Sequence, residues 1–287
     1  MQENSLLTTV MPVALAVIML GLGLSLTIED FRRVVKYPKA VFIGLVCQMI
    51  ILPLACFGIV KAFNLPSELA IGMMLLAASP GGPTANLYSH LSKGDVALNI
   101  TLTAVNSVLT LFSLPFIVEF SLSQFATAGE ISMPFRKVIE VFLIVLIPVG
   151  LGMIIKAKAS AFADKMNKPV KILSALFLVL VIVGAVLKEK DNLGLYIQQV
   201  GVAALTFNIV SMAIGYFIPR ILNINKSQSI AIGMEIGIHN GTLAIFIALN
   251  ALNSTVISMP PAIYSLIMFF TAAVFGYLVN QGREDHT

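Results

Sequence analysis

The sequence predicts an all-α polytopic membrane protein with nine transmembrane helices, and three observations support this fold class. Of 287 residues, 58% are hydrophobic and 11% are charged, whereas soluble domains carry roughly 25% charged residues. Nine apolar runs are long enough to cross a bilayer, which takes about 20 residues. Two of these runs are interrupted in the middle by polar residues, glycine or proline. The composition excludes a disordered, a disulfide-rich secreted or an ordinary cytosolic protein.

The predicted spans follow one another with short connections. In chain order they are Leu6–Leu26, Ala40–Val60, Leu69–Leu91, Val96–Phe120, Val138–Ile155, Val170–Leu187, Leu195–Ile218, Ser229–Leu249 and Ala262–Val279. The N-terminal segment lacks the basic region of a cleavable signal peptide, so the first run is expected to remain as a span. Because no long loop is left over, residues 1–287 are predicted to form a single membrane domain.

Basic residues alternate between the two sides of the predicted membrane. Thirteen Lys and Arg lie in one set of loops and five in the other, and the positive-inside rule assigns the richer set to the cytoplasm. We therefore expect the N-terminus outside, the C-terminus in the cytoplasm and the chain in the cell (inner) membrane. This use of charge explains the net charge of +4. No nucleic-acid partner is expected, and no obligate protein partner is evident.

The third and eighth runs are interrupted at corresponding positions. The third contains PGGP at residues 80–83, and the eighth contains GIHNG at residues 237–241. Each run begins with the same tetrapeptide, AIGM, at 70–73 and 231–234. Because the two runs are five spans apart, they cross the membrane in opposite directions. The pattern is typical of secondary transporters built from inverted repeats with broken helices; a proline kink or a glycine packing contact is the alternative.

Glu235 is the only carboxylate deep within a predicted span. A charge at this depth is costly and normally has a partner, yet no span carries Lys or Arg at a similar depth. We infer that a ligand cation supplies the counter-charge; a protonated, structural Glu235 is the alternative. Carboxylate, amide and carbonyl oxygens suit a hard cation such as sodium, and the helix breaks free carbonyls for this use, for instance at Ile236 and Ile238.

Other runs carry further polar residues. The fourth run carries a stripe of polar residues along one helical face. The stripe either faces a cavity or makes hydrogen bonds between helices. Its members are Asn99, Thr103, Asn106, Thr110 and Ser113. Gln48 is an isolated amide in the second run. His239 follows Glu235 by four residues, which places the two on one face of an uninterrupted helix.

Signatures of enzymes and of ATP-driven pumps are absent from the sequence. It contains no H-E-x-x-H zinc helix, no Gly-x-Ser-x-Gly elbow and no phosphate-binding P-loop. A single chain with two broken helices also favours alternating access over a channel. The expectation is therefore a protein that is not an enzyme and that needs no cofactor other than a coupling ion.

Three segments carry a resemblance to a known family. They read MLGLGLSLTIEDFRRVVKYPKAVFIGLVCQ, PGGPTANLYSHLSKGDVALNITLTAV and EIGIHNGTLA in chain order, and together they resemble the bile acid:sodium symporter family over essentially the whole chain. The resemblance implies a core in which the two broken helices cross, and a smaller panel. By analogy, the panel helices are about 6–26, 138–155 and 170–187, and the core helices about 40–120 and 195–279.

The resemblance also implies site residues. The sodium sites would share Glu235 and use Gln48, Asn86, Asn99, Thr103, His239 and the carbonyls of Ile236 and Ile238. Substrate would bind at Asn240, near the starts of the half-helices at Gly82, Thr84 and Gly241, whose amides and positive dipole ends favour a carboxylate.

Departures from the family pattern leave the coupling ion open. Ala85 stands where a serine is usual, Asn99 where a hydroxyl is usual and His239 where a glutamine is usual. Ala85 lacks an oxygen ligand, which the amide of Asn99 offers, and the imidazole of His239 is a poor sodium ligand. Pro83 removes one amide at the start of a half-helix. Two sodium ions, one sodium ion and a proton are all alternatives.

The sequence thus leads to the hypothesis of a secondary active transporter that couples sodium to a small organic anion by alternating access. The anion is expected to be bile-acid-like, pantoate-like or another carboxylate, as the resemblance implies. A proton-coupled or uncoupled carrier on the same fold is one alternative, and a membrane receptor that does not transport is another. The expected partners are the anion, sodium ions and the lipid bilayer.

Overall fold

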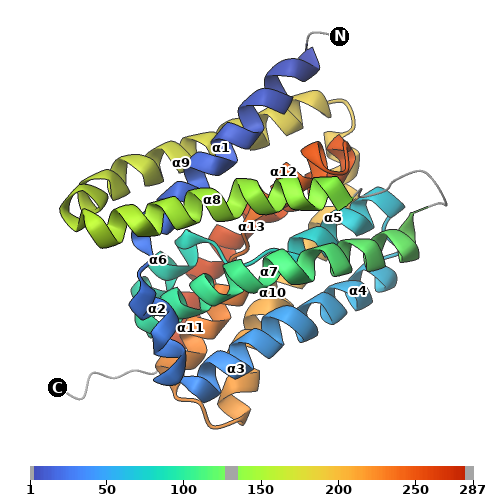
Figure 1. Cartoon of the computed structure of the whole chain (residues 1–287). Helices are drawn as coiled ribbons and strands as arrows, with labels where there is room; N and C mark the ends of the chain where they lie inside the picture. Colours follow the sequence, from blue (N-terminus) through green and yellow to red (C-terminus); the bar gives the residue numbers. More distant parts are fainter. Residues whose placement is uncertain (1–2, 127–134, 282–287) are drawn as a thin grey trace.

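The computed structural model describes residues 3–126 and 135–281, and these residues form an all-α fold (Figure 1). Within them the sole β-type pairing is an isolated bridge between Gly81 and His239. The helices are α1 (Glu3–Ser25), α2 (Ile28–Arg32), α3 (Pro38–Val46), α4 (Leu52–Ala62), α5 (Ser67–Ala78), α6 (Pro83–Leu91), α7 (Val96–Phe125), α8 (Phe135–Lys158), α9 (Ser160–Lys188), α10 (Leu193–Ile221), α11 (Lys226–Gly237), α12 (Gly241–Asn250) and α13 (Thr255–Asn280). A 3-10 turn (Arg33–Val35) follows α2, and a π-helical turn (Cys47–Ile51) joins α3 to α4.

The predicted apolar runs lie largely in these helices. The second run forms one continuous rod, Pro38–Ala62, whereas the third and eighth are divided into α5 with α6 and α11 with α12. Both breaks therefore occur where PGGP and GIHNG interrupt the sequence, which confirms that these two runs are not simple helices. Proline lacks an amide donor and glycine weakens a helix, so both segments disfavour helical continuation.

By length and apolar composition, five of the described helices could each cross a membrane. They are Pro38–Ala62, Val96–Phe125, Ile139–Lys158, Leu193–Ile221 and Thr255–Asn280. A sixth span is present if Pro12–Ser25 and Ile28–Val35, which are bent by 72° relative to each other, are counted together. The structure thus supports a multi-pass membrane protein, and the full set of nine spans stays a prediction.

Side-chain caps define where several helices begin. Asp95, Asn225 and Ser254 precede α7, α11 and α13, and each accepts a hydrogen bond from the backbone amide three residues later. Such caps satisfy one of the amides that a helix start leaves free. The starting positions of α7, α11 and α13 are therefore fixed by the residues that precede them.

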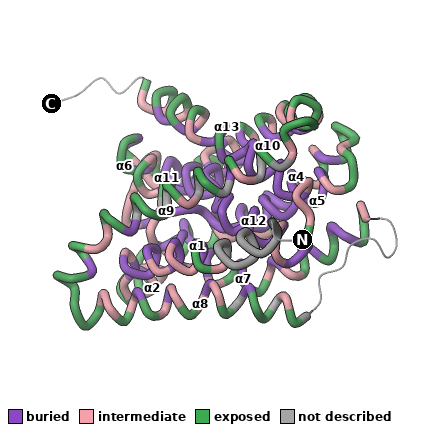
Figure 2. Tube along the Cα trace, turned by 90° about the horizontal axis from the view of Figure 1, so that it is seen from above, coloured by how far each residue is buried: buried purple, intermediate pink, exposed green. Residues whose placement is uncertain are grey.

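Three of the four short halves of the broken helices, α5, α11 and α12, occupy the centre of the molecule. All residues in Leu69–Ala78 of α5, Ser229–Gly237 of α11 and Gly241–Ala248 of α12 are buried, and Figure 2 shows buried residues concentrated along these segments. A helix that is apolar all round is expected to be enclosed by other elements. These halves are thus surrounded by the longer helices.

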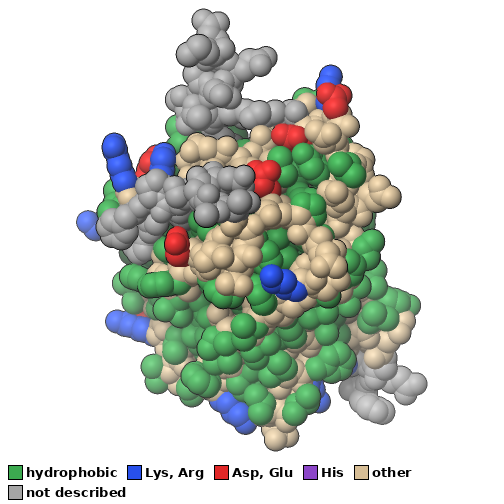
Figure 3. Space-filling model, turned by 90° about the vertical axis from the view of Figure 1, so that its right-hand side faces the viewer, with side chains coloured by type: hydrophobic (Ala, Val, Ile, Leu, Met, Phe, Trp, Pro, Cys, Tyr) green, Lys and Arg blue, Asp and Glu red, His purple; other side chains and the backbone are tan. Residues whose placement is uncertain are grey.

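The longer helices are apolar on their outer faces as well. Phe116 on α7 is 77% exposed and Phe270 on α13 is 76% exposed, and Figure 3 shows broad areas of hydrophobic side chains on one face of the molecule. In water such a surface would be unfavourable, whereas against lipid it is the expected one. On the other side of the fold, α1, α8 and α9 pack against one another (Figure 1).

Candidate functional site

The two helix breaks lie against each other and exchange backbone hydrogen bonds. The amide of Gly82 donates to the carbonyl of Ile238 at 3.0 Å, and the amide of Asn240 donates to the carbonyl of Pro80 at 2.8 Å. Gly81 and His239 lie opposite each other in the resulting antiparallel bridge. Backbone groups that a break would leave unpaired inside an apolar interior are costly. Each break therefore provides hydrogen-bond partners for backbone groups of the other break.

The carboxylate of Glu235 lies beside this junction, in the last turn of α11. Its side chain is fully buried. The hydroxyl of Thr103 donates to Oε2 at 2.6 Å and Nδ2 of Asn106 donates to Oε1 at 3.2 Å, and the backbone of Gly81 lies against the carboxylate. None of the ion pairs formed by the described residues includes Glu235.

Gly81 has room for no side chain because of this arrangement. A Cβ added there would meet the carboxylate carbon and both carboxylate oxygens of Glu235. The backbone of the first break therefore touches the acidic group of the second broken helix. Such close approach of backbone to a functional group is one of the uses of glycine.

The polar stripe of α7 faces protein, as its burial requires. Nδ2 of Asn99 donates to the carbonyl of Ala231 at 2.7 Å, one turn before Glu235 on α11, while Thr103 and Asn106 reach the carboxylate itself. The oxygens Oδ1 of Asn99 and Asn106 and Oγ1 of Thr110 are buried and have no hydrogen-bond partner among the described residues. The stripe therefore combines a hydrogen bond between helices with buried acceptor oxygens that have no donor among the described residues.

Gln48 and His239 meet at the end of α5, at the carbonyl of Ser79. Nε2 of Gln48 lies 3.0 Å from this oxygen and Nδ1 of His239 lies 3.2 Å from it. His239 does not lie one helical turn above Glu235, because α11 ends at Gly237 and the chain is extended beyond it. The expectation that the two residues share a helix face is wrong for this reason. The imidazole packs between aromatic rings, stacked on Phe207 at 5.7 Å between centroids.

The predicted substrate-binding residues lie at the starts of α6 and α12. Thr84 is exposed, Asn86 is partly buried with an unpartnered Oδ1, and Ala85 is fully buried. Asn240 caps its own helix by accepting from the amide of Leu243 at 3.1 Å. In contrast, α6 starts after Gly82 without a side-chain cap. The two half-helix starts are thus adjacent but unequal, since α12 is capped and α6 is not.

Two residues that sequence reasoning missed hold the end of α11. Nδ2 of Asn208 and the hydroxyl of Tyr264 both donate to the carbonyl of Gly237, each at 2.9 Å. Asn208 is an isolated amide within the seventh predicted span, the same signal that drew attention to Gln48. Tyr264 lies on α13 and its side chain is fully buried, and no sequence pattern links it to the second break.

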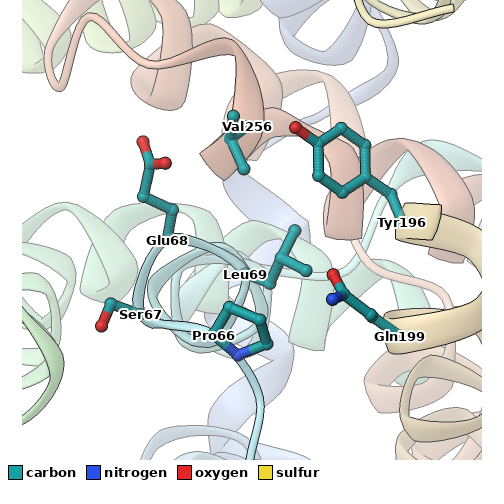
Figure 4. A pocket seen from close by; sticks show the side chains of 7 residues that line it. All are labelled: Pro66, Ser67, Glu68, Leu69, Tyr196, Gln199 and Val256. Atoms are coloured by element: carbon teal, nitrogen blue, oxygen red, sulfur yellow. The ribbon is translucent and has the colours of Figure 1, made fainter. Parts of the chain in front are cut away.

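A cavity of about 610 Å³ lies at another place in the fold and contains none of the predicted site residues. Its lining comes from the start of α5, from α10 and from α13: Pro66, Ser67, Glu68, Leu69, Tyr196, Gln199 and Val256. Figure 4 shows Tyr196 and Gln199 projecting from α10 on the side opposite Glu68. Oε1 of Glu68 accepts from the hydroxyl of Ser254 at 2.6 Å. The sequence gives no sign of this cavity, because its residues come from three distant segments.

The fold and the site together define a multi-pass helical membrane protein with a buried carboxylate at the junction of two broken helices. The sequence profile of the sodium bile acid symporter family matches residues 12–195, and the chain belongs to this family. The resemblance found in the sequence motifs is thereby confirmed.

Individual relatives cover most of the chain. A sodium-dependent transporter of Bacillus subtilis (strain 168) is 29% identical over 88% of this chain and 77% of its own length. The ileal sodium/bile acid cotransporter of Oryctolagus cuniculus is 24% identical over 98% and 81% of the respective lengths. A chloroplastic protein of Arabidopsis thaliana, described as a probable sodium/metabolite cotransporter, is 28% identical over 88% of this chain, which spans 62% of that relative. The family is one of sodium-dependent transporters, and all three relatives are described as transporters or cotransporters.

Proposed function

We propose that this protein is a secondary active symporter that couples sodium movement to transport of a small organic anion by alternating access. The observation that carries the proposal is the environment of Glu235, a buried carboxylate with neutral hydrogen-bond donors and no ion-pair partner among the described residues. A buried carboxylate without a counter-charge is expensive. A monovalent cation that binds there during transport supplies the missing charge.

The donor set around Glu235 suits sodium. One carboxylate and several neutral oxygens balance a single positive charge, and oxygen ligands are those that hard cations prefer. In the proposed site Glu235 acts with Thr103, Asn86 and Asn99. The amide oxygens of Asn86 and Asn99 are buried and have no partner among the described residues. A second position uses Gln48, the carbonyls of Ile236 and Ile238, and His239. The unpartnered Oε1 of Gln48 supports this second position.

The substrate carboxylate is proposed to bind where α6 and α12 begin. Helix starts present free amides and a positive dipole end, and both favour an anion. At the start of α6 the amides of Gly82 and Ala85 already donate to backbone carbonyls, so the amide of Thr84 is the donor proposed for the anion, whereas Asn240 caps α12, which Gly241 begins. The exposure of Thr84 provides access. Bile-acid-like, pantoate-like and other carboxylates all fit this description.

The architecture that we propose for transport has nine spans in two inverted repeats. In it α1, α8 and α9, which pack against one another, form the panel, and the other helices form the core with the two crossing breaks. Rocking of core against panel exposes the junction to either side. The chain lies in the cell membrane with its N-terminus outside, which places the cavity beside Glu68 at the outer surface.

Uptake into proteoliposomes tests the proposal. Sodium-driven uptake of a labelled carboxylate, compared with uptake driven by a pH gradient at equal sodium on both sides, identifies the coupling ion. A preceding thermal-shift screen of organic acids with and without sodium selects the carboxylate, because a ligand that binds the native state raises its apparent stability. Uptake that is indifferent to sodium contradicts the proposal.

A proton-coupled carrier is the second candidate, and the position of His239 favours it. The imidazole is buried, Nδ1 bonds the carbonyl of Ser79, and Nε2 has no partner among the described residues. In this case a pH gradient drives uptake, and His239→Gln removes the dependence on pH. Measurable ligand binding with no uptake under either gradient would instead indicate a receptor.

A further inference from the structure

The ends of α5 and α11 are held in the same way, by an amide from the preceding long helix. In the first half of the chain Nε2 of Gln48 donates to the carbonyl of Ser79, 31 residues later, at 3.0 Å. In the second half Nδ2 of Asn208 donates to the carbonyl of Gly237, 29 residues later, at 2.9 Å. Each carbonyl is the one left open where the first half of a broken helix ends. Asn208 is thus the structural counterpart of Gln48.

The orientation of both amides follows from their partners. A backbone carbonyl only accepts hydrogen bonds, so the NH2 groups of Gln48 and Asn208 must face it. The side-chain oxygens Oε1 of Gln48 and Oδ1 of Asn208 then point elsewhere, and both are buried without a partner among the described residues. The side chains of Gln48 and Asn208 are 2% and 0% exposed. Two acceptor oxygens therefore lie close to the breaks, unmatched by any described donor.

Fixing the carbonyl of Gly237 also fixes its neighbours in the chain. In a continued helix the carbonyl of Ile236 would accept from the amide of Asn240, but that amide donates to Pro80 instead. The carbonyl of Gly237, between Ile236 and Ile238, is bound by both Asn208 and Tyr264. These two donors hold the peptide group after Gly237, while the amide of Gly82 holds the carbonyl of Ile238, and together they set the direction in which the peptide groups of the second break point.

We propose that Asn208 and Tyr264 are positioning residues for the coupling-cation site, acting on the second break as Gln48 acts on the first. The inference rests on the proposed function, in which the carbonyls of Ile236 and Ile238 are cation ligands. Groups that orient metal ligands commonly change metal affinity by about 10- to 100-fold when they are removed. Loss of either donor lets the peptide groups of the break turn away from the cation.

Sodium-dependent thermal stabilisation of the purified full chain tests the inference without knowledge of the substrate. The midpoint of unfolding is measured as sodium chloride replaces choline chloride at constant ionic strength, which gives the sodium concentration for half-maximal stabilisation. For Asn208→Leu we expect this concentration to rise by about tenfold. For Tyr264→Phe, which removes a single hydroxyl, we expect a rise of about threefold.

Ser258→Ala is the matched control. Ser258 lies on α13, the helix that carries Tyr264, is fully buried, and donates to the carbonyl of Thr255 in its own helix. Its removal should leave the half-maximal sodium concentration unchanged while shifting the midpoint in choline. This separates a change in sodium affinity from a general loss of stability.

The outcomes distinguish the inference from the proposed function. A wild-type midpoint that responds equally to sodium and choline overturns the sodium site and the inference with it. A sodium response in the wild type that is quantitatively retained by both Asn208→Leu and Tyr264→Phe overturns the inference alone. Where Asn208→Leu does not fold, Tyr264→Phe decides by itself, because it removes a hydrogen bond and leaves the ring packing on Phe207 and His239 in place.

Discussion

The hydroxyl of Thr103 donates to Oε2 of Glu235 at 2.6 Å, although 132 residues separate the two in the chain. This hydrogen bond joins α7, which follows the first broken helix, to α11, the first half of the second. Together with the amide of Asn106 on Oε1 it fixes both carboxylate oxygens. The candidate site is thus assembled from both halves of the sequence.

Replacing Glu235 with Gln should abolish sodium dependence with little loss of folding. The amide is isosteric with the carboxylate and keeps polar contacts to Thr103 and Asn106, but it provides no negative charge to balance a cation. We expect sodium-driven uptake to fall by at least about 100-fold, since the charge is a direct ligand of the ion. Initial uptake rates in proteoliposomes measure this. Glu119→Gln, an exposed carboxylate on α7, serves as the control, and normal transport by Glu235→Gln would remove this residue from the mechanism.

Thr103→Val tests the hydroxyl that holds the carboxylate. Valine has the shape of threonine but cannot donate to Glu235, so the carboxylate loses its shortest hydrogen bond. We expect the sodium concentration for half-maximal uptake to rise by about tenfold. Thr101→Val is a close control, because Thr101 is also fully buried on α7 but bonds only the carbonyl of Ala97 in its own helix. Equal effects of the two changes would show that the loss is one of general packing.

Gly81→Ala should destabilise the protein, because the new Cβ would collide with the Glu235 carboxylate. Inserting a methyl group into a well-packed interior costs about 1–3 kcal/mol, so the midpoint of thermal unfolding in detergent should fall. Gly58→Ala should instead raise the midpoint of thermal unfolding. Gly58 lies inside α4 with no atom near the added methyl, and alanine is favoured over glycine within a helix by roughly 0.5–1 kcal/mol. An unchanged unfolding midpoint for Gly81→Ala would mean that the breaks are more loosely packed than described.

Glu68→Gln should slow uptake only at low ionic strength. Glu68 lines the open cavity beside Tyr196 and Gln199, where its charge attracts sodium from solution, and such steering is screened within about 10 Å at 0.1 M salt. We expect a several-fold lower initial rate at low ionic strength and no difference at high ionic strength. Glu29→Gln, which removes an exposed carboxylate paired with Arg32 on α2, is the control. A reduction that persists in high salt would indicate a structural role through Ser254.

The sequence was sufficient to locate the broken helices and the buried carboxylate. Polar residues and Pro-Gly pairs are rare in apolar runs, so PGGP, GIHNG and Glu235 stand out against a simple background. Thr103 was found through the periodicity of the stripe on α7, and the structure places it on Glu235. Local pattern is informative here because an apolar environment allows few unpaired polar groups.

Contacts that depend on where a helix ends could not be read in the same way. The spacing of Glu235 and His239 suggested one helix face, but α11 ends between them at Gly237, and His239 turns to the carbonyl of Ser79. Tyr264 was missed because a tyrosine in an apolar span is unremarkable until its hydroxyl is seen to donate to Gly237. Such pairings are set by tertiary packing, which has no signature in a single sequence.

The bridge between the two breaks has a consequence for how this protein can be altered. The amides of Gly82 and Asn240 and the carbonyls of Ile238 and Pro80 that form it are all main-chain atoms. Most side-chain replacements therefore leave its donors and acceptors in place, so the side chains around the bridge can be changed while the bridge persists. Removing the bridge itself requires a change to the main chain, such as an ester oxygen in place of the backbone N–H of Asn240.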